Sequence, residues 1–262
     1  FSGSASGTIQ NSGTFTLLSD AVTISIPANA QFWIRQFWQG ASGTIYSSTA
    51  DPANMGDAAK GAASGLSDQT ISCGAITSPV SSAALYPLAI IAPIAVPSVC
   101  IVGDSIAYGL NDIYSNASGD LGIVARSIGP QFGYSDLSGD GGGAFCWTNA
   151  GPTGQCLQIL GRVVFPYCSH AIIEFGHNDF ASESATTATL QIALSSLYGE
   201  FSNRTKVFQT TIIPTTTSTD SWATTTNQSV TAWENYRTAF NDSLRTSSFG
   251  PNAGEFDIDS AL

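Results

Sequence analysis

Apolar and polar positions alternate along the first part of the chain. The alternation is strict in residues 15–17 and again in residues 22–26, where Pro27 ends it, and β-favouring aromatic residues crowd residues 31–38. A period of two places successive side chains on opposite faces of a strand. We therefore expect residues 1–96 to form a small β-rich accessory module.

The pattern changes at about residue 97, where short apolar runs alternate with stretches of helical spacing. Strands are predicted at the run ending at Val102, at 170–175 and at 206–213, and the start of a last strand at 256–258. Apolar spacing of the helical type covers 190–201 and 230–244. Strands that alternate with helices are typical of a parallel sheet covered on both faces. We predict a doubly wound, flavodoxin-like α/β domain over residues 97–262, flanked by helices and preceded by the β-rich module.

One apolar run, residues 83–102, is long enough to suggest a membrane helix. It contains Pro87, Pro93 and Pro97, each of which would interrupt a helix. We expect two short strands joined by proline turns instead, and no membrane segment.

The charge balance narrows the classes of partner. Eight Lys and Arg oppose nineteen Asp and Glu, which gives a net charge of -11. Nucleic acids and anionic membranes need basic surfaces, so neither is expected as a partner, and an uncharged or cationic ligand is favoured. The low charge content, with abundant Ser, Thr and Gly, predicts a secreted or periplasmic protein. The sequence begins at Phe1 without a signal peptide, so we expect a processed or trimmed form.

Five cysteines leave one unpaired under any disulfide scheme, and none has the paired CxxC spacing of a zinc site. Cys146 and Cys156 flank a loop-like segment and form the favoured bridge, whereas Cys100 lies in an apolar run and is expected to be a small core residue. No metal and no cofactor are predicted.

Three loops carry candidate chemistry. Ser105 follows a predicted strand in Gly103-Asp104-Ser105, at the strand end where α/β sheets bind ligands, and Asn178 follows the next strand in residues 176–179. A glycine run, 139–143, lies between them. A serine nucleophile with several donors for a developing oxyanion is what acyl transfer requires. Taken singly, a helix cap at 104–105 or 178–179 and a simple turn at the glycines are equally open.

In order and spacing, these blocks resemble the first three motifs of the SGNH (GDSL) hydrolase superfamily. The resemblance covers about residues 97–262. It implies that Ser105 is the nucleophile and that the oxyanion hole consists of the backbone N–H groups of Ser105 and Gly141 with the side chain of Asn178. The choice of Gly141 over Gly139 or Gly142 stays open.

The chain departs from the family at its fourth block, Asp-x-x-His, which supplies the base. The only histidines are His170 and His177, and Tyr167 and Glu174 stand three residues before them. We expect a structural role for His170 and do not assign the base to His177. No catalytic His or Asp is therefore expected in this chain. Either a C-terminal segment or separate fragment past Leu262 carries the block, or the fold has lost its base.

These observations predict a serine esterase that acts on acetyl or other short acyl esters of carbohydrate. Its partner would be a small-molecule or carbohydrate ester. The alternative is a non-catalytic carbohydrate- or ester-binding protein, with Trp33 and Trp38 as stacking platforms. A third possibility is that the N-terminal module mediates assembly.

Overall fold

The structure is a computed structural model of the 262-residue chain. It describes residues 18–27, 32, 34–35, 37, 68, 70, 89–93, 95–112, 120–147 and 157–261. The chain divides into two compact units, Phe1–Pro87 and Leu88–Leu262. Most of the first unit, including Trp33, Trp38 and the strand predicted at 15–17, lies outside the described residues, so the β-rich module stays a prediction.

The strand predicted at residues 22–26 is wrong. Residues 18–27 are described and carry no regular secondary structure, and the side chains of Val22 and Ile24 are 76% and 71% exposed. Alternation prepares a segment for a sheet, but a strand forms only where a neighbouring strand accepts its backbone hydrogen bonds.

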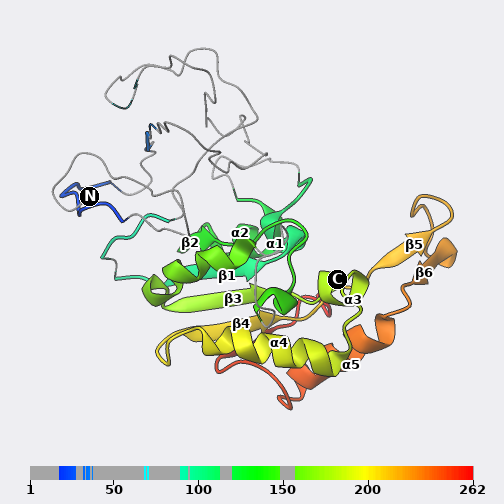
Figure 1. The fold of residues 1–262 in the computed structure, drawn as a ribbon. Helices are drawn as coiled ribbons and strands as arrows, with labels where there is room; N and C mark the ends of the chain where they lie inside the picture. Colours follow the sequence, from blue (N-terminus) through cyan, green and yellow to red (C-terminus); the bar gives the residue numbers. More distant parts are fainter. Residues whose placement is uncertain are drawn as a thin grey trace, which may run out of the picture. The chain divides into compact units, whose positions relative to one another are not determined.

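The second unit is built on a five-stranded sheet of order β2-β1-β3-β4-β7, parallel throughout (Figure 1). Its strands are β1 (Ser98–Gly103), β2 (Gly133–Asp136), β3 (His170–Glu174), β4 (Lys206–Thr210) and β7 (Gly254–Phe256). This is the flavodoxin-like strand order, in which strands are added on one side of β1 and then on the other. The point between β1 and β3 where the order reverses leaves a crevice at their carboxyl ends. The predicted fold class is confirmed.

Helices cover both faces of the sheet (Figure 1). Successive side chains of β1 point to opposite faces, so this one strand contributes to the packing on both. Val99 and Ile101 pack with one set of helices, α1 (Ser105–Tyr108) and α2 (Gly122–Ile128). Cys100 and Val102 point to the other face, which is covered by η3 (Leu157–Tyr167), α4 (Thr187–Gly199) and α5 (Glu234–Arg245). Because both faces are buried, the strand is apolar at every position from 99 to 102 rather than at every second one.

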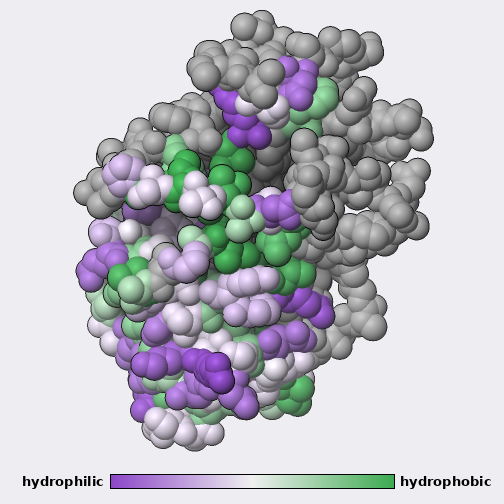
Figure 2. Space-filling model, turned by 90° about the vertical axis from the view of Figure 1, so that its left-hand side faces the viewer, coloured by the Kyte–Doolittle hydropathy of each residue, from purple (hydrophilic) through white to green (hydrophobic). Residues whose placement is uncertain are grey.

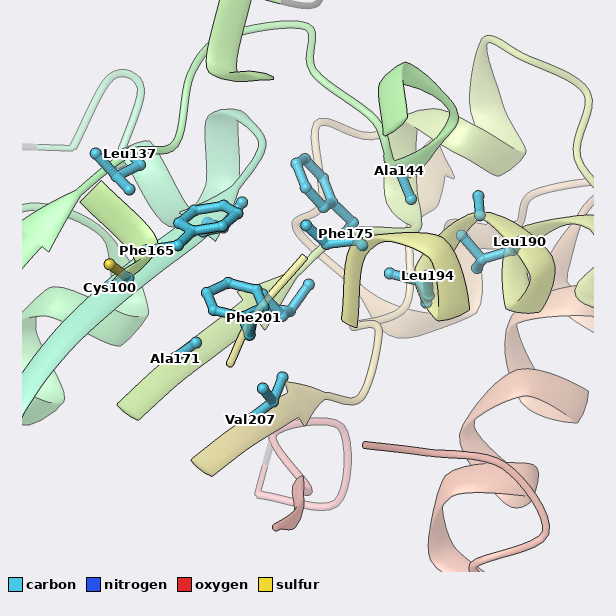
Figure 3. Packing of buried hydrophobic residues seen from close by; sticks show 14 of the residues in the cluster. Cys100, Leu137, Ala144, Phe165, Ala171, Phe175, Leu190, Leu194, Phe201 and Val207 are labelled. Atoms are coloured by element: carbon cyan, nitrogen blue, oxygen red, sulfur yellow. The ribbon is translucent and has the colours of Figure 1, made fainter. Parts of the chain in front are cut away.

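The larger of the two cores lies between the sheet and α4. Figure 3 shows Leu190 and Leu194 of α4 pointing towards Phe175, with Phe165 and Phe201 stacked over the strands at 4.1 Å between ring centroids. Helix α4 begins at a capping box, in which Thr186 and Thr189 exchange side-chain and backbone hydrogen bonds. This packing fixes the carboxyl ends of β1 and β3 relative to each other.

A disulfide joins Cys100 on β1 to Cys168, just before β3. Cys100 is fully buried, as expected, but it is half of a bridge rather than a free core thiol. The favoured pair was a different one: the side chain of Cys146 and the whole of Cys156 lie outside the described residues, so that pairing stays untested. Sequence spacing pointed elsewhere because Cys100 and Cys168 are 68 residues apart and meet only through the strand pairing.

Other boundaries differ from the prediction in detail. Of the run at 83–102, only 98–103 forms a strand within the described residues. Val230 lies in an antiparallel hairpin and not in the helix predicted at 230–244, which begins at Glu234. The hairpin consists of β5 (Thr216–Ser218) and β6 (Gln228–Val230), joined through η4 (Thr225–Asn227). The other short helices are η2 (Ala144–Trp147) and α3 (His177–Ala181).

The surface mixes hydrophilic and hydrophobic residues on the face shown in Figure 2, with hydrophilic ones dominant in its lower part. Of the charged side chains that the structure describes, the fully or almost fully buried ones are those of Asp104, Asp120, Glu174, Asp179 and Arg237. Among the described residues, no helix is long and apolar enough to cross a membrane.

Candidate active site

Ser105 stands directly after the carboxyl end of β1, as the first residue of α1. The cap of this helix is Asp104, whose Oδ1 accepts a hydrogen bond from the Ile106 N–H at 2.8 Å. Ser105 itself is half-buried, and neither its hydroxyl nor its backbone N–H hydrogen-bonds within the part of the chain that the structure describes. The capping role therefore belongs to Asp104, which leaves the Ser105 hydroxyl available for a ligand.

Gly103 allows this turn to sit tightly on the neighbouring strand. A Cβ at Gly103 would lie 2.6 Å from the Cβ of Ala107 and 2.7 Å from the carbonyl oxygen of Glu174. Neither neighbour can move without shifting α1 or β3. The glycine of Gly103-Asp104-Ser105 is thus required by packing, and it brings the first turn of α1 against the end of β3.

Two buried carboxyl groups hold that first turn. Asp104 binds the Ile106 N–H, and Oε2 of Glu174 accepts from the Ala107 N–H at 3.2 Å. Burial, followed by repulsion from Asp104, raises the pKa of Glu174 well above its ordinary value of 4.5. The Oδ2 of Asp104 is buried and has no hydrogen-bond donor among the described residues, and the carboxyl group of Glu174 is near enough to interact electrostatically with Asp104. A protonated Glu174 that donates to Asp104 satisfies both groups.

Asn178 reaches the same edge of the sheet from α3, which follows β3. Gly176 makes the turn with a φ of 132°, and a Cβ there would lie 2.2 Å from Cδ1 of Ile212. The Asn178 Nδ2 donates to the carbonyl oxygen of Gly142 at 2.8 Å. Since an amide nitrogen carries two hydrogens, one remains for a further acceptor. The structure therefore brings Asn178 and the glycine run together.

Asp179 is a site residue that sequence reasoning treated only as a possible helix cap. Its two carboxylate oxygens accept from the backbone N–H groups of Ala144 and Phe145, each at 3.0 Å. A Cβ at Gly143 would lie 3.1 Å from the Asp179 carboxylate. Burial raises the pKa of Asp179 to about 6. Asn178 thus binds the glycine run and Asp179 binds the two residues directly after it, which fixes this segment to α3. In the sequence, this role could have been suspected from an acidic residue directly after Asn178 in a chain that also contains a glycine run.

The three candidate glycines differ in what their N–H groups do. The Gly139 N–H donates to the carbonyl oxygen of Gly103 at 3.1 Å, and the Gly142 N–H donates to that of Gly139 at 3.4 Å. Gly141 has a φ of 72°, in the region that favours glycine. Its N–H makes no hydrogen bond among the described residues.

Neither histidine hydrogen-bonds Ser105 within the described residues. His170 begins β3, at the edge opposite Ser105, where its Nδ1 shares a hydrogen bond of 2.9 Å with the Ser169 hydroxyl. His177 follows β3 on the correct edge, but its Nδ1 lies 3.2 Å from the Thr215 hydroxyl and its ring makes an edge contact with Trp233. The structural placement of His170 agrees with the sequence prediction.

The carboxylates that follow β7 form ion pairs with arginines of α5. Asp257 accepts from Nε of Arg245 at 2.8 Å, which lowers the pKa of Asp257 below its ordinary range. Asp259 pairs with Arg237 at 2.6 Å and with Arg245 at 2.7 Å. These ion pairs fasten the segment after β7 to α5. Within the described residues, no cluster of three or more His, Cys, Asp or Glu could hold a metal ion.

A cleft opens beside Ser105 on the α1–α2 side. Ile106, Leu110 and Ile123 give it an apolar lining, and Asp112 and Arg126 border it as an ion pair at 2.7 Å. Leu110 and Ile123 are 45% and 39% exposed, so apolar surface is open to a ligand next to the serine hydroxyl.

The structure thus combines a flavodoxin-like parallel sheet of order β2-β1-β3-β4-β7 with Ser105, the glycine run and Asn178 after β1, β2 and β3. Solved structures with a similar fold include an M. smegmatis aryl esterase at 16% identity, which matches 63% of this chain and 85% of its own with a TM-score of 0.43. Another is AlinE4, an SGNH-hydrolase family esterase at 14% identity, which matches 59% of this chain and 72% of its own with a TM-score of 0.34.

A third is a mutant of Axe2, an acetyl-xylooligosaccharide esterase from Geobacillus Stearmophilus, at 16% identity. It matches 57% of this chain and 70% of its own, with a TM-score of 0.35. No family model and no curated protein matches the chain. At these identities the likeness concerns the fold, and the substrates named belong to those proteins.

Proposed function

We propose that the protein is a serine esterase of the SGNH type. One observation carries the proposal: Ser105, whose hydroxyl makes no hydrogen bond among the described residues, stands at the carboxyl edge where Asn178 is hydrogen-bonded to the glycine run. β1 and β3 are hydrogen-bonded neighbours, with Gly103 opposite Glu174, so the loops that follow them begin side by side. That juxtaposition is what a nucleophile and an oxyanion hole require.

In the proposed reaction, Oγ of Ser105 attacks the ester carbonyl carbon and transfers its proton to a base. The carbonyl oxygen becomes an oxyanion, held by the N–H groups of Ser105 and Gly141 and by the second amide hydrogen of Asn178. Collapse breaks the bond to the alcohol, which leaves with a proton from the base. Water then hydrolyses the acyl-enzyme and restores Ser105.

The base would be an imidazole from outside residues 1–262, either further along the polypeptide or on a separate fragment. The positions of His170 and His177 support this, because one is at the wrong edge and the other is held by Thr215 and Trp233. Loss of the base from such a triad reduces turnover by several orders of magnitude, and the oxyanion hole alone retains the rest.

The substrate we propose is an acetyl or other short acyl ester of a carbohydrate. The apolar lining of Ile106, Leu110 and Ile123 suits a small acyl group, and a net charge of -11 disfavours polyanionic substrates. We also propose that the protein is secreted or periplasmic. The disulfide between Cys100 and Cys168 supports an oxidising compartment.

The decisive experiment restores the missing base with free imidazole. The 262-residue chain is treated with a fluorophosphonate probe with and without imidazole, and the adduct is located by mass spectrometry. We expect imidazole to accelerate labelling of Ser105. A Ser105→Ala variant should not be labelled, and a Ser195→Ala variant, altered at an exposed serine on α4, should label like wild type. Equal labelling of the Ser105→Ala variant and wild type would overturn the proposal.

A second candidate function is a non-catalytic carbohydrate- or ester-binding protein on the same scaffold. The observation that favours it is the commitment of both histidines to other contacts. Imidazole-dependent aryl acetate hydrolysis separates the two. An increment that depends on Ser105 supports the esterase, whereas ester binding without any such increment supports the binding protein.

A further inference from the structure

The β5–β6 hairpin projects beyond the carboxyl edge of the sheet (Figure 1). It follows β4, just as α1 follows β1 and α3 follows β3, so it springs from the edge that carries Ser105 and Asn178. The reaction proposed above makes no use of it. An element in this place is positioned to meet the part of a substrate that extends away from the serine.

The base of the hairpin is fixed. Ile212, two residues after β4, donates its N–H to Asn241 at 2.8 Å, and its carbonyl oxygen accepts from Arg237 at 2.8 Å and from Asn241 at 2.9 Å. Thr215 then shares its hydroxyl with His177, the residue immediately before the candidate oxyanion amide. The hairpin is therefore held to α5 on one side and to the active-site loop on the other.

The turn of the hairpin is organised by one carboxylate. Asp220 accepts from the Ser218 hydroxyl at 2.7 Å, from the Thr224 hydroxyl at 2.7 Å and N–H at 3.0 Å, and from the Asn227 amide at 3.0 Å. These hydrogen bonds, that of Thr224 first, lower the pKa of Asp220 below its ordinary range. Polar side chains are thus held in place around the turn.

Trp222 lies in this turn in a conformation that ordinary residues avoid. Its φ is 62°, and that of Ser221 before it is 58°. The indole Nε1 donates to the Thr216 hydroxyl at 3.0 Å, and the backbone N–H donates to the Ser218 hydroxyl at 2.8 Å. Trp222 is nevertheless 59% exposed. Consecutive left-handed residues cost free energy, and the surrounding hydrogen bonds maintain them.

An exposed indole held in this way is suited to bind a sugar ring. Because the indole N–H is already bound by Thr216, the ring offers a ligand its carbon surface. The faces of an aromatic ring are electronegative and attract the slightly positive C–H groups on one side of a pyranose. Hydroxyl and amide groups around the turn match the polar rim of the same ring, whereas a buried apolar partner would leave them without water.

We infer that Trp222 is a stacking platform for a sugar unit remote from the scissile ester, an inference that rests on the proposed function. The indole reaches back from the turn to Thr216, the first residue of β5, so the ring is held on the hairpin itself. The hairpin follows β4, which lies two strands away from β1 and Ser105, or roughly 10 Å at the spacing of strands in a sheet. A platform that begins there would meet a sugar unit beside the one that carries the acyl group. The substrate would then be an acylated oligosaccharide or polysaccharide rather than an acylated monosaccharide.

Calorimetry with unacylated hexasaccharides tests this independently of catalysis. Hexamers of xylose, glucose, mannose and N-acetylglucosamine are titrated into the 262-residue chain. We expect at least one to bind, about tenfold more weakly to a Trp222→Ala variant, with most of the affinity kept in Trp222→Phe. Val230→Ala is the matched control, since Val230 is equally exposed on the same hairpin and should bind like wild type.

The inference is overturned if no hexamer binds, or if Trp222→Ala binds as tightly as wild type. It is also overturned if Trp222→Ala lowers the molecular mass in solution, because the indole would then contact a second copy of the chain. Labelling of Ser105 distinguishes this failure from that of the proposed function. Labelling without sugar binding refutes the platform alone, and sugar binding that depends on Trp222 without labelling refutes the esterase alone.

Discussion

The carboxyl groups of Asp104 and Glu174 are buried against each other, and each also accepts a backbone N–H from the first turn of α1. Asp104 adjoins Ser105 in sequence, and Glu174 ends the neighbouring strand. The turn that carries the proposed nucleophile is therefore held by two acids, and burial raises the pKa of both. His177 and Asp179, both on α3, are the other titratable groups that act on Asp104 or are acted on by it.

Replacement of Glu174 by Gln should remove part of the pH dependence of folding. The folded-state pKa of Glu174 is raised, so its stabilising contribution is complete below 4.5 and is lost as the pH rises through the raised value. Gln stays neutral and can both donate to Asp104 and accept from Ala107. We expect the unfolding free energy of Glu174→Gln to fall less than that of wild type between pH 5 and pH 9.

Urea unfolding across that range measures the effect. Glu174→Ala is the contrasting variant, since it leaves Asp104 without its partner, and it should be destabilised by about 2–3 kcal/mol at pH 5, with a smaller difference from wild type as the pH rises. Parallel pH curves for Glu174→Gln and wild type would show that the proton lies elsewhere.

Asp179 should hold in place the segment that directly follows the glycine run. Asp179→Ala leaves the buried N–H groups of Ala144 and Phe145 without acceptors, and we expect a loss of about 2–4 kcal/mol in unfolding free energy. Asp179→Asn retains one acceptor and should lose less. Because the pKa of Asp179 is raised to about 6, wild type should lose stability as the pH rises through 6, and Asp179→Asn should lack that component.

The readout for the site is the imidazole-dependent labelling of Ser105. If Asp179 positions the oxyanion donors, Asp179→Ala should label more slowly even under conditions where it is fully folded. If the folded Asp179→Ala protein is labelled as fast as wild type, Asp179 stabilises the fold but does not position the oxyanion donors.

Gly176 should tolerate no side chain. Its φ of 132° and the 2.2 Å approach of Ile212 to an added Cβ combine backbone strain with overpacking. We expect Gly176→Ala to lower the unfolding free energy by about 2–4 kcal/mol. Gly133→Ala, where nothing lies within 4 Å of an added Cβ, is the matched control and should stay within about 0.5 kcal/mol of wild type. Thermal or urea unfolding of both variants decides the matter.

The disulfide should stabilise the second unit strongly. A bridge that closes a loop of 68 residues is worth about 4 kcal/mol on loop-closure arguments. A Cys100→Ala, Cys168→Ala double variant should show that loss in urea unfolding under non-reducing conditions. Addition of a reductant should destabilise wild type by about that amount more than it destabilises the double variant. A double variant as stable as wild type would contradict this assignment.

Sequence patterns identified the strands that are buried on both faces and the helices with clear apolar spacing. β1 and β3 contain continuous apolar runs, 99–102 and 171–173, and Leu190, Leu194 and Leu197 recur on one side of α4. β2 was missed because it is an edge strand with half-buried and exposed residues, so it lacks such a run. The β5–β6 hairpin was missed because Thr and Ser fill β5, and β6 contains a single apolar residue, Val230, which was assigned to the following helix.

The candidate site divides in the same way. Ser105 and Asn178 were found because short motifs name them at the ends of predicted strands. Glu174 was identified as a strand residue only, since its role depends on a contact with Asp104 across two strands that no local pattern encodes. The pairing of Cys100 with Cys168 is of the same kind, because parallel strand register brings together residues that are far apart in sequence.

That bridge has a consequence for cleavage of the chain. The loop between Cys100 and Cys168 contains Ser105, α2, β2 and the glycine run, so most of the proposed site lies on one covalently closed ring. A protease that cuts once inside this ring opens it without releasing a fragment. Such a nicked protein would migrate as one band until it is reduced, and Ser105 and Asn178 would stay tethered across the cut.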